Sequence, residues 1–258
     1  MLNTPKISVI VPAYNEEQYL PTTLASLRQA AAYYRRERGA EIEIIVADNN
    51  STDRTGNLAR ECGADQVVRE PINQISRARN AGARVARGEW LAFCDADNRV
   101  TENLFVAIHD NLSQTDVIGG GTLVTPEKFN FTVAVCFTAW KIFSLFGQVG
   151  VGVMHCRKAD FDRFGGFNEE MFAGEDVQFA YDLRKLGRAT GRPRFVVRRD
   201  AAIITSMRKT EEFSFPTIAV RLLRISVGMQ RKLRDKRYCS LWYDVSRGRK
   251  KQEKSSTN

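Results

Sequence analysis

Short apolar runs alternate with longer amphipathic stretches through the first 124 residues of the chain. The apolar runs cover residues 7–13, 42–47, 66–68, 90–94 and 117–124. Several of them consist almost entirely of Val and Ile, which is typical of strands that are buried on both faces. The stretches between them predict helices over residues 16–38, 53–62, 75–86 and 102–112. Strands that alternate with helices predict a three-layer α/β structure with right-handed crossovers.

The middle of the chain departs from this alternation. Residues 131–154 contain a single charge, at Lys141, and several aromatic side chains. The run is long enough to span a bilayer, but the central lysine and the interspersed polar residues and glycines argue against a transmembrane helix. We expect a buried helix followed by a Gly-rich loop or strand. An apolar surface that holds a lipid-like substrate is a third interpretation.

The last part of the chain returns to helical spacing. Residues 159–187 predict a helix, a turn and a second helix, and residues 201–205 predict one more strand. Residues 215–233 place basic side chains beside apolar ones, which predicts a basic amphipathic helix. The polar residues that follow predict a disordered tail.

Composition is that of an ordinary soluble globular protein. The chain has 258 residues, of which 43% are hydrophobic and 27% are charged, enough for one large domain or two small ones. Five cysteines are scattered without a C-x-x-C pair, so neither a disulfide framework nor a structural zinc site is indicated. The sequence does not begin with a basic-then-apolar leader, so we expect no secretory signal peptide and a cytoplasmic location.

The formal net charge of +9 is concentrated at one end of the chain. Residues 207–258 contain 14 Lys and Arg against 5 Asp and Glu, whereas the preceding 206 residues are balanced. A neutral body with a basic tail predicts that the tail meets an anionic partner. The inner surface of a membrane and nucleic acid both qualify. Nucleic acid is disfavoured because the body shows no recognition motif for it.

Acidic side chains stand at the ends of predicted strands. Asp48 closes the second strand, and Asp95 and Asp97 follow the fourth. Ligands of open α/β sheets bind at the carboxyl ends of the strands. Two aspartates that flank one small residue suit a hard divalent cation that shares its coordination with substrate phosphates. The competing interpretation is a loop in which Asp caps a turn.

Six short motifs follow one another along the chain. They are VPAYNEE at 11–17, ADNNSTD at 47–53, SRARNAG at 76–82, FCDAD at 93–97, GGFNE at 165–169 and GED at 174–176. In this order and spacing they resemble the family 2 glycosyltransferases, inverting enzymes of the GT-A fold. The likeness covers residues 6–208. It implies a GT-A-type three-layer α/β/α sandwich with a mixed, mainly parallel central sheet.

The resemblance also implies an activity and a division of the chain. The activity is a metal-dependent, inverting transfer of a sugar from a nucleotide-diphospho-sugar, with a UDP-sugar favoured, to an acceptor hydroxyl. Residues 1–206 would form the glycosyltransferase domain, with a nucleotide-binding half (1–98) and an acceptor and catalytic half (99–206). We expect the tail, 207–258, to seat the enzyme peripherally on the inner membrane face, near a lipid-linked acceptor or a glycan.

The resemblance assigns donor-binding roles to individual residues. Asp48 would accept a hydrogen bond from the imino N–H of the nucleotide base, and Arg79 would lie near the base and ribose. Asp97 would bind Mn²⁺ or Mg²⁺ directly, while Asp95 would touch the ribose or the metal shell. The other nucleotide-binding candidates are Pro12, Ala13, Tyr14, Glu16, Asn50 and Arg208.

Asp176 is the candidate general base of this resemblance, and Glu175 would assist it in positioning. Asp176 would take the proton of the acceptor hydroxyl while that oxygen attacks the anomeric carbon opposite the leaving group. Gly174, directly before them, would let the loop approach closely. The opposing interpretation is that acids in the first turn of a helix are simply stabilised by the helix dipole.

Two features depart from the family pattern. Asn49 and Asn50 stand where the family usually has Asp and Gly, and the Gln-x-x-Arg-Trp motif of processive members is missing. We therefore expect the transfer of one or a few sugars rather than polymer synthesis.

Two other functions compete with this interpretation. A sugar-phosphate nucleotidyltransferase would carry a Gly-rich, basic N-terminal signature, which residues 11–17 lack. A non-catalytic GT-A-like module that binds at the membrane is the other, and the presence of Asp95, Asp97 and Asp176 counts against it.

Overall fold

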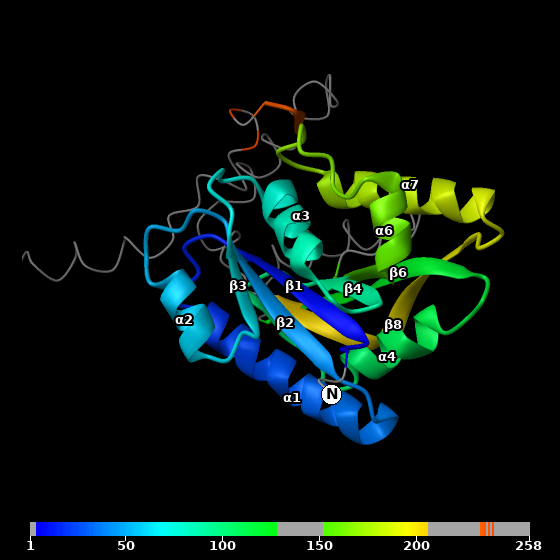
Figure 1. Cartoon of the computed structure of the whole chain (residues 1–258), viewed down its shortest axis with the longest axis horizontal. Coiled ribbons are helices and arrows are strands. Elements are labelled where there is room, and N and C mark those ends of the chain that lie inside the picture. The colour runs from blue at the N-terminus through cyan, green and yellow to red at the C-terminus, as the bar shows by residue number, and fades with distance from the viewer. Residues whose placement is uncertain (1–3, 128–151, 206–232, 236, 238, 240–258) are drawn as a thin grey trace, which may run out of the picture.

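The computed structural model describes residues 4–127, 152–205, 233–235, 237 and 239 (Figure 1). Its strands are β1 (Ile7–Ala13), β2 (Ile42–Asp48), β3 (Gln66–Arg69), β4 (Trp90–Phe93), β5 (Asn98–Val100), β6 (Val117–Pro126), β7 (Met154–Arg157) and β8 (Arg194–Thr205). Its helices are α1 (Leu20–Arg38), α2 (Thr55–Glu61), α3 (Ile75–Val85), α4 (Leu104–Leu112), α6 (Lys158–Phe164) and α7 (Glu175–Ala189).

The strands of the described part form one mixed sheet in the order β3-β2-β1-β4-β7-β6-β8-β5. Strands β1 to β4 run parallel to one another, β7 is antiparallel to both its neighbours, and β8 runs parallel to β6 and antiparallel to β5. In the parallel part, Ala13 pairs with Asp48, so the carboxyl ends of β1 and β2 lie at one edge. This edge receives the loops that carry the acidic motifs.

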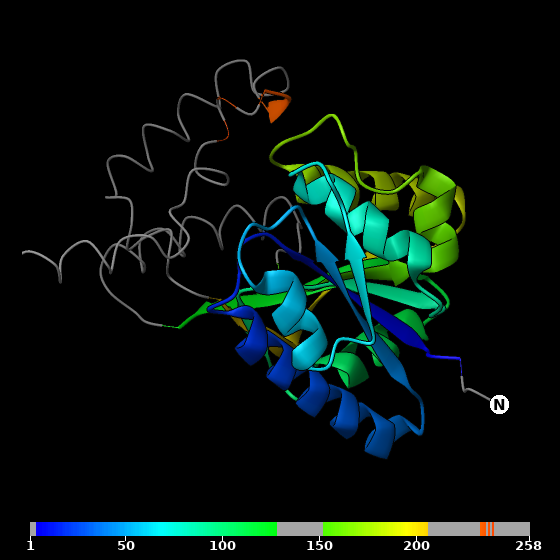
Figure 2. The same cartoon turned by 60° about the vertical axis from the view of Figure 1, so that its left-hand side comes forward.

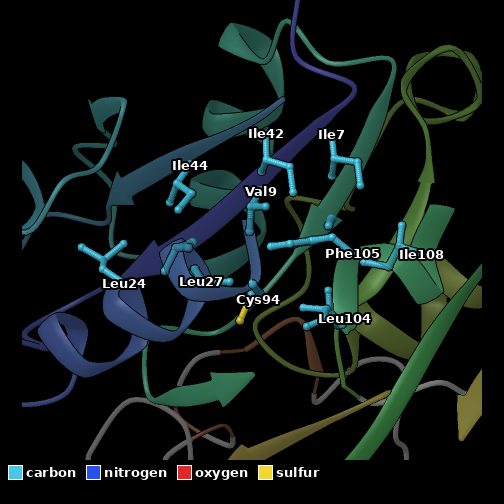
Figure 3. Close-up of a cluster of buried hydrophobic side chains, with 14 of the residues drawn as sticks. Ile7, Val9, Leu24, Leu27, Ile42, Ile44, Cys94, Leu104, Phe105 and Ile108 are labelled. Carbon is cyan, nitrogen blue, oxygen red and sulfur yellow. The ribbon is translucent and has the colours of Figure 1, made fainter. Parts of the chain in front are cut away.

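Helices cover both faces of the sheet, with α1, α2 and α4 on one side and α3, α6 and α7 on the other (Figure 1). Successive residues of a strand point to opposite faces, so Val9 and Val11 join the first layer while Ile10 joins the second. Figure 3 shows the first layer, in which Leu24 and Leu27 of α1 and Phe105 of α4 pack beneath the strands. Both faces of β1 are therefore buried, as its continuous apolar sequence predicts.

The second layer contains a cluster of phenylalanines. Phe167 lies in the turn after α6 and stacks on Phe179 of α7, with ring centroids 4.7 Å apart. The edge of the same cluster reaches the sheet at Phe93, whose ring centre is 4.9 Å from that of Phe167. Aromatic pairs in these geometries add to the stabilisation from buried area. The cluster fixes the turn and α7 against the end of β4.

Most of the predicted elements are confirmed, and the differences have physical reasons. The sequence pattern missed β5 and β7, because their sequences, Asn-Arg-Val and Met-His-Cys-Arg, are short and are not apolar runs. Strand β8 begins at Arg194, well before the apolar run at 201–205, because the charged first half lies exposed or half-buried. Helix α1 begins at Leu20 rather than at residue 16.

Two predictions concern residues that the structure does not describe. The apolar run 131–154 lies outside the described residues up to position 151, and the basic helix over 215–233 lies outside them except for Leu233. Among the helices that are described, none combines the length and apolar character that a membrane span requires.

Gly82→Ala in α3 is expected to destabilise the protein although alanine favours helices. The new methyl group would lie 2.5 Å from Cγ2 of Ile10. Overpacking costs about 1–3 kcal/mol, against a propensity gain of about 1 kcal/mol. Urea unfolding measures the change, and an Ile10→Ala background should shrink the penalty. A single variant more stable than wild type would contradict the close approach of α3 to β1.

Candidate active site

Three loops leave the same edge of the sheet, one after each of β1, β2 and β4. The first two are tied together by hydrogen bonds. The backbone N–H of Asn15 donates to Oγ of Ser51 at 3.0 Å, and the N–H of Thr52 donates back to Oδ1 of Asn15 at 2.8 Å. The N–H of Glu16 donates to Oγ1 of Thr55 at 2.8 Å. The loops therefore hold one fixed arrangement above the sheet edge.

The structure places the predicted residues of the first loop at different depths. Pro12 and Ala13 are buried in β1 itself, Glu16 is buried, and Tyr14 is half-buried. Asn50, in the second loop, has a φ of 65°, in the left-handed region that glycine and asparagine adopt most readily. Asparagine at 50 can therefore take the backbone conformation of the glycine that it replaces.

Asp48 closes β2 and has a structural task of its own. Its Oδ1 accepts a hydrogen bond from the N–H of Ser51 at 3.0 Å, and its carbonyl accepts one from the N–H of Glu70 at 2.8 Å. The side chain is half-buried at the sheet edge. A turn-capping hydrogen bond thus engages one carboxylate oxygen of Asp48 and holds the side chain at the sheet edge.

Asn49 explains one departure from the family pattern. Its side chain is buried, its Oδ1 accepts from the N–H of Gln74 at 3.0 Å, and its Nδ2 donates to Oδ1 of Asn73 at 3.3 Å. An ionised aspartate could accept but could not donate. The amide at position 49 therefore joins the end of β2 to the residues that precede α3.

The loop after β4 carries Asp95 and Asp97. Asp95 exposes 49% of its side chain, and Asp97 is half-buried. Ala96 between them is buried, and its carbonyl accepts a hydrogen bond from Oγ1 of Thr23 at 2.7 Å. The loop is thereby anchored to α1 while both flanking carboxylates remain partly accessible.

Arg79 of α3 lies at the centre of the acidic groups. Its Nη2 is 2.9 Å from Oδ1 of Asp95, and its Nη1 is 2.8 Å from Oε1 of Glu175. Only 6% of the side chain is exposed, and the guanidinium lies 5.1 Å from the ring centre of Phe167. Burial alone would lower the pKa of Arg79, but the charges of Asp95, Glu175 and Asp176 outweigh it and raise the pKa. Arg79 stays cationic there.

The two acids of the last motif begin α7. Gly174 precedes them with a φ of 74°, a conformation that glycine tolerates best. Glu175 is buried, and burial together with the charges of Asp176 and Asp95 raises its pKa, while Arg79 opposes the rise. Asp176 is half-buried, and its Oδ1 accepts from the N–H of Val177 at 2.7 Å. The structure thus brings Asp95 and Glu175 into contact with one cation, and the charge of Asp176 lies near enough to raise the pKa of that cation.

Helix α3 also holds the loop that leads into α7, a task that the sequence analysis missed. Asn80 donates to the carbonyl of Phe167 and accepts from its N–H, both at 2.9 Å. Nε2 of Gln74 donates to the carbonyl of Met171 at 2.9 Å, and Arg77 pairs with Glu169 at 2.7 Å. The polar side chains of the motif at 76–82, together with Gln74 just before it, therefore support the loop. Sequence spacing does not show which residues they contact.

A second support was missed because it comes from the predicted tail. The N–H of Phe172 donates to the carbonyl of Leu233 at 2.7 Å, and Arg234 pairs with Glu170 at 3.0 Å. Cys239 is fully buried nearby; burial raises its pKa to about 11, and the charge of Glu175 acts in the same direction. Figures 1 and 2 show the described residues of this stretch, in orange, beside the loop before α7. Arg208 lies outside the described residues.

Neither histidine contacts the site carboxylates within the described residues. Nδ1 of His109 is 2.7 Å from the hydroxyl oxygen of Tyr34. His155 is fully buried in β7, its Nε2 is 2.7 Å from Nδ2 of Asn111, and burial lowers its pKa to about 4. The chemistry of this edge therefore rests on carboxylates.

Asp95 and Asp97 fit a shared metal rather than a cage built by the protein alone. Among the described residues, no three His, Cys, Asp or Glu side chains gather closely enough to hold an ion. Two partly accessible carboxylates offer the hard oxygen ligands that Mg²⁺ and Mn²⁺ prefer, and such ions usually keep waters and bind substrate phosphates. The donor set therefore fits a cation completed by a diphosphate.

Comparison with known families gives one match over more than half of the chain. The family model described as "Glycosyl transferase family 2" matches residues 8–154. The probable glycosyltransferase YdaM of Bacillus subtilis is 27% identical over 210 residues, which cover 72% of this chain and 48% of that protein. The uncharacterized glycosyltransferase EpsJ of the same organism is 30% identical over 123 residues, covering 45% and 34%. The chain thus spans half or less of these curated relatives.

Solved structures share the fold at low sequence identity. The mannosyltransferase PcManGT of Pyrobaculum calidifontis, in complex with GDP-Man and Mn²⁺, has a TM-score of 0.67 and 20% identity over 92% of this chain and 65% of its own. TarS 1–349 of S. aureus, in complex with UDP-GlcNAc, has a TM-score of 0.58 and 22% identity over 79% and 59%. The GT-A fold that the sequence motifs implied is confirmed.

Asn49→Asp, which restores the usual family residue, is expected to lower the free energy of unfolding by about 1–3 kcal/mol, because Oδ1 of Asn73 loses its donor and a carboxylate replaces a buried amide. Urea denaturation at pH 7 measures this. Asn50→Gly is the matched control, since its φ of 65° suits glycine, and it should unfold like wild type. An Asn49→Asp protein as stable as wild type would contradict the bridging role of Asn49.

Proposed function

The chain belongs to glycosyl transferase family 2, and we propose that it is a metal-dependent, inverting enzyme that transfers a sugar from a nucleotide-diphospho-sugar to an acceptor hydroxyl. The observation that carries the proposal is the convergence of Asp95 and Glu175 on Arg79, which brings the loop after β4 and the start of α7 together. In this proposal, the donor binds at the end of β4 and the candidate general base Asp176 acts from the beginning of α7.

On the donor side, we propose that Asp48 accepts a hydrogen bond from the imino N–H of the base. Pro12, Ala13 and Glu16 would contribute backbone, and the ring of Tyr14 would line the pocket. Uracil and guanine both carry such an N–H. A UDP-sugar remains our preferred donor, and solved neighbours with UDP-GlcNAc and with GDP-Man represent both base types.

Asp97, with Asp95 beside it, would hold Mn²⁺ or Mg²⁺ against the diphosphate of the donor. When bound, the cation supplies positive charge that stabilises the departing nucleoside diphosphate. Support comes from the carboxylates themselves and from solved neighbours that contain Mn²⁺. The protein's own part would be to hold the loop that carries both side chains, and the hydrogen bond from Thr23 to the carbonyl of Ala96 supports this role.

On the acceptor side, we propose that Asp176 takes the proton of the attacking hydroxyl. The acceptor oxygen forms its bond to the anomeric carbon while the bond from that carbon to the diphosphate oxygen breaks. A single displacement of this kind inverts the anomeric configuration. Asp176 is half-buried at the beginning of α7, and Glu175 beside it is tied to Arg79, which fixes the direction of the helix start.

We propose a non-processive transfer to a lipid-linked acceptor or a glycan. The proposal rests on the missing Gln-x-x-Arg-Trp motif and on the basic residues 207–258. In this proposal those residues attract the enzyme to the inner face of an anionic membrane, and Arg208 contacts the diphosphate.

The donor site is tested by thermal shift with UDP, GDP, dTDP and CDP, each with and without Mn²⁺. One diphosphate should raise the melting temperature of wild type only with metal, and Asp97→Ala should abolish that shift. No shift with any nucleotide would contradict a donor site and favour a non-catalytic module.

Asp176→Asn separates chemistry from binding. The variant should keep the nucleotide-dependent shift but lose about 10²–10⁴-fold in turnover, the usual contribution of a general base. Donor consumption with an acceptor screen gives the rate, and NMR of the product gives the anomeric configuration. Turnover within a few-fold of wild type would reject Asp176 as the base, and retention of configuration would reject the single displacement.

A further inference from the structure

The contacts of Arg79 differ from those expected of a residue that binds the donor. The family resemblance places it near the base and ribose, yet both terminal nitrogens of its guanidinium are engaged by protein carboxylates. We propose that Arg79 is a positioning residue, which holds Glu175, and with it the helix start that carries Asp176, at a fixed place relative to Asp95. This inference rests on the proposed function, because it concerns the alignment of base and donor.

The element that carries Arg79 is held rigidly. Gly82, one turn further along α3, lies so close to Ile10 of β1 that a methyl group would not fit. Asn80, which directly follows Arg79, fixes the backbone of Phe167 with two hydrogen bonds. The guanidinium is therefore presented from a helix anchored both to the sheet and to the loop that leads into α7.

The shape of the guanidinium matters as well as its charge. Its two terminal nitrogens bind one carboxylate each, one from the loop after β4 and one from the first residue of α7. Phe167 lies against the guanidinium and is itself stacked on Phe179 of α7. Arginine can bridge two acceptors in a fixed plane, whereas lysine offers a single compact charge on a flexible stem.

Because Arg79 and Glu175 are both buried, loss of the ion pair between them is expected to affect Glu175 strongly. The side chains of Arg79 and Glu175 are only 6% and 9% exposed, so neither charge is well solvated by water. An ion pair that loses one buried partner leaves an uncompensated charge. Without the arginine, Glu175 is expected to take up a proton or to turn toward solvent. Either change removes the tie that Arg79 makes to the first turn of α7. We expect that turn to shift as a result, and a displacement of about 1 Å at reacting groups can cost about 100-fold in rate.

A donor-binding role would give a different set of results. An arginine that held the base or ribose would contribute to nucleotide affinity in the ground state, and its loss would weaken binding. A positioning arginine leaves binding nearly unchanged and lowers the rate of the chemical step. The ratio of the two effects therefore distinguishes the two roles.

The experiment is a double-mutant cycle with Arg79→Met, Glu175→Gln and the double variant, with Arg79→Lys alongside. For each, kcat is measured at saturating donor and acceptor, and nucleotide affinity is measured by titration calorimetry with Mn²⁺.

Arg79→Met should lose about 100-fold in kcat while its nucleotide Kd stays near wild type. The double variant should be no worse than Arg79→Met, because a neutral amide at position 175 needs no cation. Arg79→Lys should recover part of the loss.

Two results would overturn the inference. A large rise in nucleotide Kd with unchanged kcat would make Arg79 a donor contact. Multiplicative losses of kcat in the double variant would show that Arg79 and Glu175 act independently.

The measurements distinguish a failure of the proposed function from a failure of the positioning role of Arg79. A wild type that binds no nucleotide and turns over no donor would reject that function, and the positioning role with it. Urea unfolding of the same variants then still tests whether Arg79 and Glu175 interact. If the changes in unfolding free energy of the two single variants add up in the double variant, that interaction is refuted. Should Arg79→Met not fold, Arg79→Lys completes the same cycle.

Discussion

The buried guanidinium of Arg79 is the interaction on which the arrangement of the site depends. It comes from α3, which packs on the parallel part of the sheet, and it reaches one carboxylate from each half of the chain, Asp95 and Glu175. A charge this deeply buried is tolerated only because it is paired and hydrogen-bonded. The same requirement that stabilises the fold therefore sets the distance between the loop after β4 and the start of α7.

Helix α3 consequently contacts three parts of the structure, which are the sheet, the loop before α7 and the acidic side chains. Its glycine at 82 permits close packing on β1, Asn80 supports the loop before α7 together with Gln74, which directly precedes the helix, and Arg79 links Asp95 to Glu175. A single stiff element with several tasks leaves little freedom for independent motion of the loops. The helix that packs on the core sheet therefore also positions the side chains of the candidate site.

The sequence predicted the parts of the fold that depend on local pattern. Continuous Val and Ile runs located β1 and β2, and the acids after β2 and β4 were correctly placed at strand ends because parallel strands share one edge. The pattern could not show which acids meet Arg79, since Glu175 is far from it in the sequence. It also missed the contacts of Leu233, because a carbonyl that accepts a hydrogen bond leaves no mark on residue type.

The hydrogen bond between Phe172 and Leu233 has a consequence for the order in which the protein is completed during synthesis. Chains emerge from the ribosome N-terminus first, so β1 to β4 and α3 are available before α7, and α7 before Leu233. The sheet edge formed by β1, β2 and β4 can fold while the loop before α7 still lacks this second anchor. Under the proposed function, nucleotide binding is therefore expected to mature earlier on the ribosome than catalytic competence.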